Sequence, residues 1–112
     1  MKRYVGLDVH SKSSTFVIQD ESGSIVGRGA IPTTPDGFKQ LRDQNLLEPG
    51  TRVALESGTV AFFSAEQLSN LGLTPQVIDA HEVRVKASRP LQKSDSRDAL
   101  ELCEGLRRGI YR

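Results

Sequence analysis

The chain has 112 residues, of which 37% are hydrophobic and 26% charged, and its formal net charge is +1. This length allows one domain with its own core, and the single cysteine excludes a disulfide framework and fits a reducing compartment. No apolar run is long enough to cross a membrane, and Asp8 interrupts the first apolar stretch too early for a signal peptide, so we expect a cytoplasmic protein.

Three strands are expected at the start of the chain. Residues 3–10, 13–20 and 24–32 are rich in β-branched and other apolar residues and are separated by short polar turns. The short connections favour an antiparallel meander. A helix is expected over residues 33–50, with Thr34 as its cap, Pro35 at its first position and Pro49-Gly50 at its exit.

The rest of the chain alternates between strands and helices. Strands are expected at 51–57 and 74–80, a helix between them at 59–72, an irregular basic stretch at 81–93 and a last helix at 94–110. Crossover helices favour parallel, right-handed connections. The pattern therefore predicts an α/β fold of the ribonuclease H-like type: a five-stranded mixed sheet of order 3-2-1-4-5 with helices on both faces. Such sheets bind ligands where the connection direction changes, here between the first and fourth strands.

The charge distribution separates the last third of the chain from the rest. Residues 1–80 carry seven Lys or Arg against nine Asp or Glu, whereas residues 81–112 carry eight against five. This asymmetry indicates a polyanion as partner.

Four acidic residues are expected to meet at the crevice. Asp8 interrupts the central strand, where a buried carboxylate is costly without a partner, and Glu56 ends the neighbouring strand on the same sheet face. At about 100° per residue, Asp95 falls on the centre of the last helix's apolar stripe and Asp98 at its edge. Helix capping by the aspartates and an ion pair of Glu56 with an arginine are the structural alternatives.

A divalent cation would relieve the repulsion among such carboxylates. Converging carboxylates raise one another's pKa, and Mg²⁺, or Mn²⁺ in its place, is held by a few carboxylates together with substrate phosphate oxygens. Two such ions, roughly 3.5–4 Å apart, clamp the attacking and leaving oxygens in phosphodiester chemistry. The acidic residues thus predict a metal-dependent enzyme acting on a phosphodiester.

Three segments resemble the N-terminal, RuvC-like domain of the DEDD transposases, the Piv-type recombinases of bacterial insertion sequences. They are YVGLDVHSKSSTFVIQDESGSIV, VALESGTVAFF and KSDSRDALELCEGLRRGIY. The resemblance implies that Asp8, Glu56, Asp95 and Asp98 are the catalytic, Mg²⁺-binding residues of a domain that helps cleave and rejoin DNA strands during transposition. It also implies a homo-oligomeric full-length protein and, because some members use a bridge RNA, a guide RNA as a candidate partner.

The resemblance has a consequence for domain organisation. Family members are normally longer and have a C-terminal transposase domain that supplies a nucleophilic serine. Residues 1–112 are therefore expected to form the catalytic RuvC-like domain alone, which would not complete recombination without that second domain.

Other residues give weaker signals. Five basic residues are candidates for binding the nucleic-acid backbone, each with a solvated charge as the alternative: Lys12, Arg84, Lys86, Arg89 and Lys93. His10 and His81 lack zinc-site spacing and are interpreted as non-ligands. Two Tyr, four Phe and no Trp leave little material for stacking on bases.

Three alternatives stay open. A stand-alone RuvC-like Holliday-junction resolvase would use the same acids. A fragment of an actin-like or sugar-kinase ATPase would explain GLDVHSKSSTFVIQD, but it predicts a Gly-rich phosphate loop that the sequence lacks. A non-catalytic module would use the fold only to bind RNA or protein.

Overall fold

The computed structural model describes residues 2–86 and 95–111, without the side chains of residues 95–97. Five strands form one sheet in the order β3-β2-β1-β4-β5. The β1–β2 and β2–β3 pairs are antiparallel, and the β1–β4 and β4–β5 pairs are parallel. The predicted mixed sheet, with the first strand in the middle, is confirmed. The strands are β1 (Arg3–Val9), β2 (Ser13–Asp20), β3 (Ile25–Pro32), β4 (Arg52–Glu56) and β5 (Thr74–Ile78).

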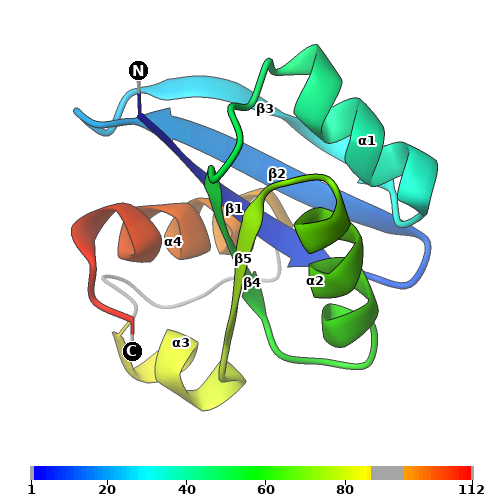
Figure 1. Ribbon diagram of the computed structural model, residues 1–112. Helices are drawn as coiled ribbons and strands as arrows, with labels where there is room; N and C mark the ends of the chain where they lie inside the picture. Colours follow the sequence, from blue (N-terminus) through cyan, green and yellow to red (C-terminus); the bar gives the residue numbers. More distant parts are fainter. Residues whose placement is uncertain (1, 87–94, 112) are drawn as a thin grey trace.

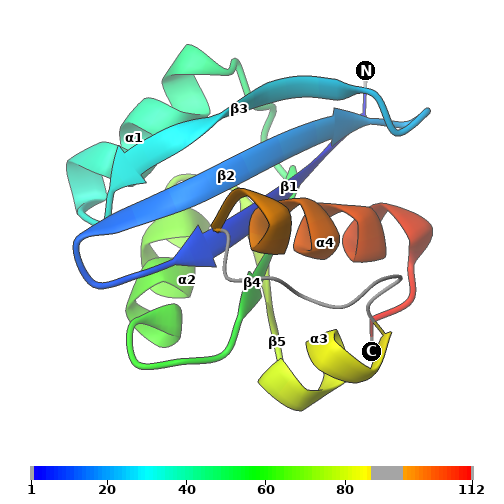
Figure 2. The same ribbon diagram turned by 180° about the vertical axis from the view of Figure 1, so that it is seen from behind.

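Helices cover both faces of this sheet. The helices are α1 (Pro35–Gln44), α2 (Ala61–Asn70), α3 (Ala80–Lys86) and α4 (Asp95–Arg108). In Figure 1 the viewer looks onto α1 and α2, and the opposite view in Figure 2 looks onto α4, with α3 near the end of β5. Within the described residues, no helix combines the length and apolar character needed to cross a membrane.

The first helix ends earlier than the sequence predicts. α1 begins as expected, with the Thr34 hydroxyl accepting from the Gly37 amide, but it stops at Gln44 rather than near residue 50. Leu46 adopts a left-handed conformation (φ 53°), and the Leu47 amide donates to the carbonyl of Arg42. This is the hydrogen-bond pattern of a Schellman motif. It turns Leu47 into the core, where 7% of it is exposed.

The stretch predicted to be irregular from residue 81 begins with a helix. Asp79 caps α3, because its Oδ1 accepts from the amides of His81 and Glu82 at 2.8 and 3.4 Å. Val83 anchors the helix in the core. An acidic cap followed three residues later by Glu is a helix-start signal, but here it lies directly behind a strand. Residues 87–93, the rest of that stretch, lie outside the described part.

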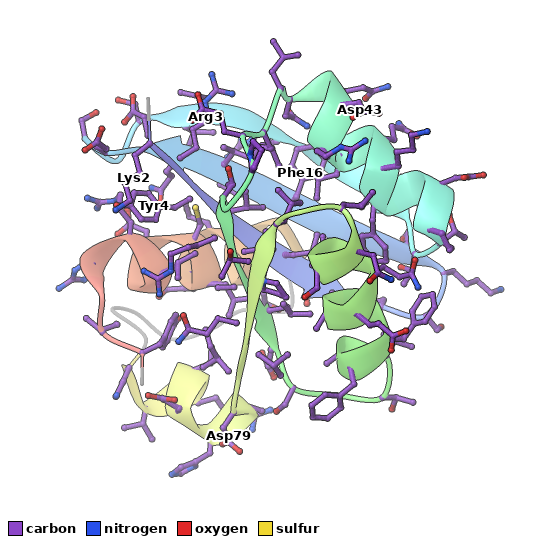
Figure 3. The ribbon with its side chains drawn as sticks, in the orientation of Figure 1. Lys2, Arg3, Tyr4, Phe16, Asp43 and Asp79 are labelled. Atoms are coloured by element: carbon purple, nitrogen blue, oxygen red, sulfur yellow. The ribbon has the colours of Figure 1, made fainter. Side chains whose placement is uncertain are left out.

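The core is divided by the sheet into two layers. Alternate residues of β1 and β4, such as Leu7 and Leu55, face α1 and α2. The residues between them, such as Ala54, face α3 and α4. Phe16 of β2 belongs to the first layer and lies beside α1 (Figure 3).

Gly6 lets α4 lie directly on the central strand. A Cβ atom at Gly6 would overlap the carbonyl oxygen of Ala99 and the backbone nitrogen of Cys103. The Cys103 thiol also donates to the carbonyl of Tyr4 at 3.0 Å. Because Ala99 lies over Gly6 and Cys103 also contacts Tyr4, α4 runs antiparallel to β1. Its N-terminus therefore lies at the carboxyl end of that strand.

Candidate active site

A pocket with a volume of about 210 Å³ lies at the carboxyl ends of the parallel neighbours β1 and β4. Asp8, Glu56 and Asp98 all line it, and so does His10. The predicted crevice is therefore where the structure brings three of the four predicted acids together. The wall is completed by the end of β1 and the β4–α2 connection, from Val9 and residues 57–61.

Asp8 is held in the sheet and contacts a histidine. Residue alternation places Asp8 on the α4 face, two residues beyond Gly6, and it is 9% exposed. Its Oδ2 lies 3.1 Å from Nε2 of His10, whose side chain is 55% exposed. His10 thus lines the pocket and contacts the Asp8 carboxylate there.

Two hydroxyl groups fix the turn that follows β1. The buried Thr33 hydroxyl donates to the carbonyl of His10 at 2.6 Å, and the Thr33 amide donates to the carbonyl of Lys12. Thr33 Oγ1 is also 2.7 Å from the buried Ser14 hydroxyl, which must be the donor because the Thr33 proton is already used. The turn carrying His10 and Lys12 is thereby tied to the end of β3.

Glu56 lies in an environment that disfavours its charged form. Burial raises the pKa of the Glu56 carboxyl, the nearby Arg84 opposes this, and the carboxylates of Asp98 and Asp79 raise the pKa further. Asp79 lies where β5 passes into α3, at the opposite end of the sheet from Lys2 and Arg3 (Figure 3). A cation placed among these carboxylates would favour the ionised form of Glu56.

The connection after Glu56 is fixed to the next strand. The Ser57 amide donates to the carbonyl of Ile78 at 2.8 Å, and the Ser57 hydroxyl accepts from the Ala80 amide at 3.1 Å. These bonds hold the ends of β4 and β5 side by side, so Glu56 leaves the sheet at a defined point. This strand-to-helix turn is therefore both a structural connection and part of the pocket wall.

The first turn of α4 supplies the remaining acids. Asp98 is partly buried and lines the pocket, and it precedes Ala99, which contacts Gly6. Asp95 is the first residue of α4, but its side chain lies outside the described part of the structure. The predicted meeting of the four acids is therefore observed for Asp8, Glu56 and Asp98, while the position of the Asp95 side chain and the role of all four stay predictions.

The donor set fits a hard divalent cation. Three carboxylates supply the oxygen atoms that Mg²⁺ prefers, and burial, with the nearby carboxylates of Asp98 and Asp79, raises the pKa of Glu56. In their present positions, however, no three acidic, His or Cys side chains among the described residues are grouped closely enough to hold a metal ion. Metal binding by these residues would therefore require their side chains to rotate. Asp95 is the fourth candidate ligand.

The predicted basic residues have different surroundings. Lys12 is exposed on the β1–β2 turn, and Arg84 is exposed on α3 with its charge acting on Glu56. Lys86 instead donates to Glu82 at 2.7 Å and to the carbonyl of Ile110 at 3.0 Å, so it joins α3 to the end of the chain. Arg89 and Lys93 lie outside the described residues.

Sequence reasoning underrated one member of the pocket. The sequence interprets His10 as a non-ligand because it lacks zinc-type spacing; the structure leaves that prediction untested but shows that His10 contacts Asp8. The signal was present in the same strand alternation that was applied to the acids, because residues two apart on a strand share a face.

Comparison with protein families gives one match that spans nearly the whole chain. The family model DEDD_Tnp_IS110, described as a transposase, matches residues 5–112. No curated protein matches the chain in sequence.

Comparison with solved structures shows the fold. RuvC from T. thermophilus, solved in complex with a Holliday junction substrate, superposes with a TM-score of 0.64 over 100% of this chain and 99% of that chain, at 10% identity. The ethanolamine utilization protein EutJ from Carboxydothermus hydrogenoformans superposes with a TM-score of 0.51 at 17% identity, over 74% of this chain and 38% of that one. At such identities the likeness establishes a RuvC-like fold and no more.

Proposed function

The chain belongs to the DEDD transposase family and forms its RuvC-like domain, and from this premise we propose that its acidic pocket binds Mg²⁺ and cleaves phosphodiester bonds of DNA. The observation that carries the proposal is the convergence of Asp8, Glu56 and Asp98 on one pocket from β1, β4 and α4. Mn²⁺ is the expected substitute, since it accepts the same oxygen ligands.

The residues of the pocket would have different roles in binding the cation and the DNA. Asp8, Glu56, Asp98 and Asp95 would hold the cation, which, when bound, supplies Lewis acidity and activates a hydroxyl or water for attack on phosphorus. His10 would keep the Asp8 carboxylate oriented through their 3.1 Å contact. Arg84 and Lys12, both exposed near the pocket, would receive the phosphates that flank the cleaved bond.

DNA as the substrate is supported by the family and by the fold neighbour. RuvC was solved with a Holliday junction substrate, so branched DNA is a rational first substrate, and the resolvase alternative can be tested in the same assay. A guide RNA and a homo-oligomeric full-length protein belong to the proposal through the family alone. A C-terminal domain with its serine nucleophile stays part of the same expectation.

The metal site is tested first, by thermal unfolding of the chain at increasing Mg²⁺ or Mn²⁺. A ligand at 100 times its Kd raises the free energy of unfolding by about 2.7 kcal/mol. We expect this rise in the unmodified chain and its loss in Asp8→Asn and Asp98→Asn. The matched control is Glu66→Gln, which removes an exposed acid of α2 outside the pocket.

Two results would contradict the proposal. An equal metal-dependent rise in Asp8→Asn and in the unmodified chain would place metal binding elsewhere. Binding that is intact in the unmodified chain, with no Mg²⁺-dependent nicking of duplex or branched DNA even when a C-terminal transposase domain is supplied, would make the domain a binding module. Junction cleavage by this chain alone would favour the resolvase alternative.

A further inference from the structure

Two adjacent phenylalanines at the start of α2 are exposed to solvent. Phe62 is 76% exposed and Phe63 45% exposed, whereas the other two phenylalanines, Phe16 and Phe38, are 7% and 0% exposed. Aromatic side chains contribute strongly to stability when they are buried. Two of the four phenylalanines therefore lie outside the core, on successive positions of the first turn of α2, and exposed aromatic side chains of this kind are candidates for an interaction site.

The exposed pair directly follows the wall of the acidic pocket. Thr59, Val60 and Ala61 line that pocket, and Phe62 is the next residue. Thr59 and Val60 also line an adjoining depression of about 320 Å³, together with Val9, His10 and Ser11. The depression and the pocket share four lining residues and therefore adjoin each other just before α2 begins: Val9, His10, Thr59 and Val60.

The charges around the pair are mixed. The first turn of α2 contains no acidic residue, but the exposed Glu66 follows Phe63 by three residues and Phe62 by four, so its carboxylate lies one helical turn from the pair. The exposed Lys12 lies on the turn after β1, next to residues that line the same depression. A phosphate backbone is therefore expected to pass on the side of Lys12, at the N-terminal end of α2 and away from Glu66.

We propose that Phe62 and Phe63 form a stacking surface for an unpaired base of the DNA strand whose phosphate lies at the acidic pocket. This inference rests on the proposed function and adds the kind of contact that presents the strand. Base–aromatic stacking tolerates any sequence, because every base has a π-face. The composition offers little aromatic material for a long platform, but two adjacent rings are enough for one or two bases.

The test compares two single-stranded oligonucleotides of the same length, one normal and one abasic throughout. They carry the same phosphate charge and differ only in their bases. Binding is measured by fluorescence anisotropy with Mg²⁺ at a fixed low ionic strength, and a gel confirms that the oligonucleotides are intact. We expect the chain to prefer the normal strand, and Phe62→Ala and Phe63→Ala each to weaken its binding by about tenfold. Binding of the abasic strand should not change.

Conservative variants separate stacking from general hydrophobic contact. Phe62→Tyr keeps the ring and should bind as the unmodified chain does, whereas Phe62→Leu should bind as weakly as Phe62→Ala. The matched control is Leu46→Ala, which removes an apolar side chain that is 81% exposed and lines a pocket with Arg3 and Glu48, away from the acidic site. All five single variants change exposed side chains, so their melting temperatures should stay within about 2 °C of the unmodified chain.

Each other outcome overturns the inference in a distinguishable way. Normal binding by the double variant Phe62→Ala/Phe63→Ala, or an equal loss on both oligonucleotides, contradicts stacking but leaves the proposed function intact. Failure of the unmodified chain to bind either oligonucleotide contradicts both. A dimer that dissociates in the double variant, with DNA affinity unchanged, would assign the pair to a protein interface instead.

Discussion

The face of the sheet under α1 and α2 and the face under α4 are made of alternate residues of the same strands, yet they have different compositions. Leu7 and Leu55 are fully buried on the first face, while their immediate neighbours Asp8 and Glu56 emerge on the second. The apolar face fixes the register of the strands, since a slip by one residue would exchange the two sets. Burial of Leu7 and Leu55 thereby determines on which face of the sheet Asp8 and Glu56 lie.

The largest effect should come from breaking the contact that brings α4 onto the second face. Gly6→Val would place a side chain where the backbone of Ala99 and Cys103 lies, so α4 would have to leave the sheet and take Asp98 with it. The backbone of Ala99 and Cys103 cannot easily move aside, so this overpacking should lower the free energy of unfolding by about 3 kcal/mol or more. We expect loss of cooperative unfolding in circular dichroism, or a much lower melting temperature.

Gly58→Ala is the control for this effect. A Cβ at Gly58 meets no atom within 4 Å, so the variant should unfold like the unmodified chain. If Gly6→Val retained the native melting temperature, the close packing of α4 on β1 would be wrong.

A smaller but still large effect is expected from the first face. Leu55→Ala removes a fully buried side chain from the layer under α1 and α2, and such truncations cost about 2–5 kcal/mol. Leu46→Ala makes the same chemical change at an exposed position and should stay within about 0.5 kcal/mol. Chemical denaturation of both variants measures the difference. Equal stabilities would refute the assignment of Leu55 to the core.

The order of the strands could be predicted from the sequence because short turns and crossover helices leave few topologies. The errors came where a helix signal conflicted with another signal. Pro49-Gly50 is a strong stop, but the need to bury Leu47 ended α1 at Gln44, through a left-handed leucine that no propensity would suggest. The helix cap at Asp79 was not predicted because Asp79 directly follows β5 in the sequence and can be read as a continuation of that strand.

The site could be predicted as far as backbone periodicity reaches. Strand alternation placed Asp8 and Glu56 on one face, and helical periodicity turned Asp98 toward them. Periodicity does not give side-chain rotamers, so the sequence could not tell that, among the described residues, no three acidic, His or Cys side chains are grouped closely enough to hold a metal ion. Nor could it tell that Phe62 would stay outside the core, because this depends on how α2 docks on the sheet.

The smallest expected effect is a pH dependence of stability that comes from Glu56, on the face of the sheet that carries the carboxylates. Because burial and the nearby Asp98 and Asp79 raise the pKa of Glu56 above its ordinary value of 4.5, the folded chain holds this proton to higher pH than the unfolded chain. The contribution of Glu56 to stability should therefore fall as pH rises above about 4.5 and stay low once the folded form has ionised. Glu56→Gln, which cannot ionise, should escape that loss.

We expect Glu56→Gln, without divalent metal, to be more stable than the unmodified chain near pH 7, by less than about 1 kcal/mol because solvent reaches this half-buried carboxylate. The difference should vanish near pH 4, and saturating Mg²⁺ should reverse it, since only the carboxylate gains from the cation. Melting temperatures across this pH range, with Glu66→Gln as the exposed-acid control, measure it. If the difference in melting temperature between Glu56→Gln and the unmodified chain were the same at all pH values, the pKa of Glu56 would not be raised in the folded chain. A metal ion would then have no repulsion to relieve at this position.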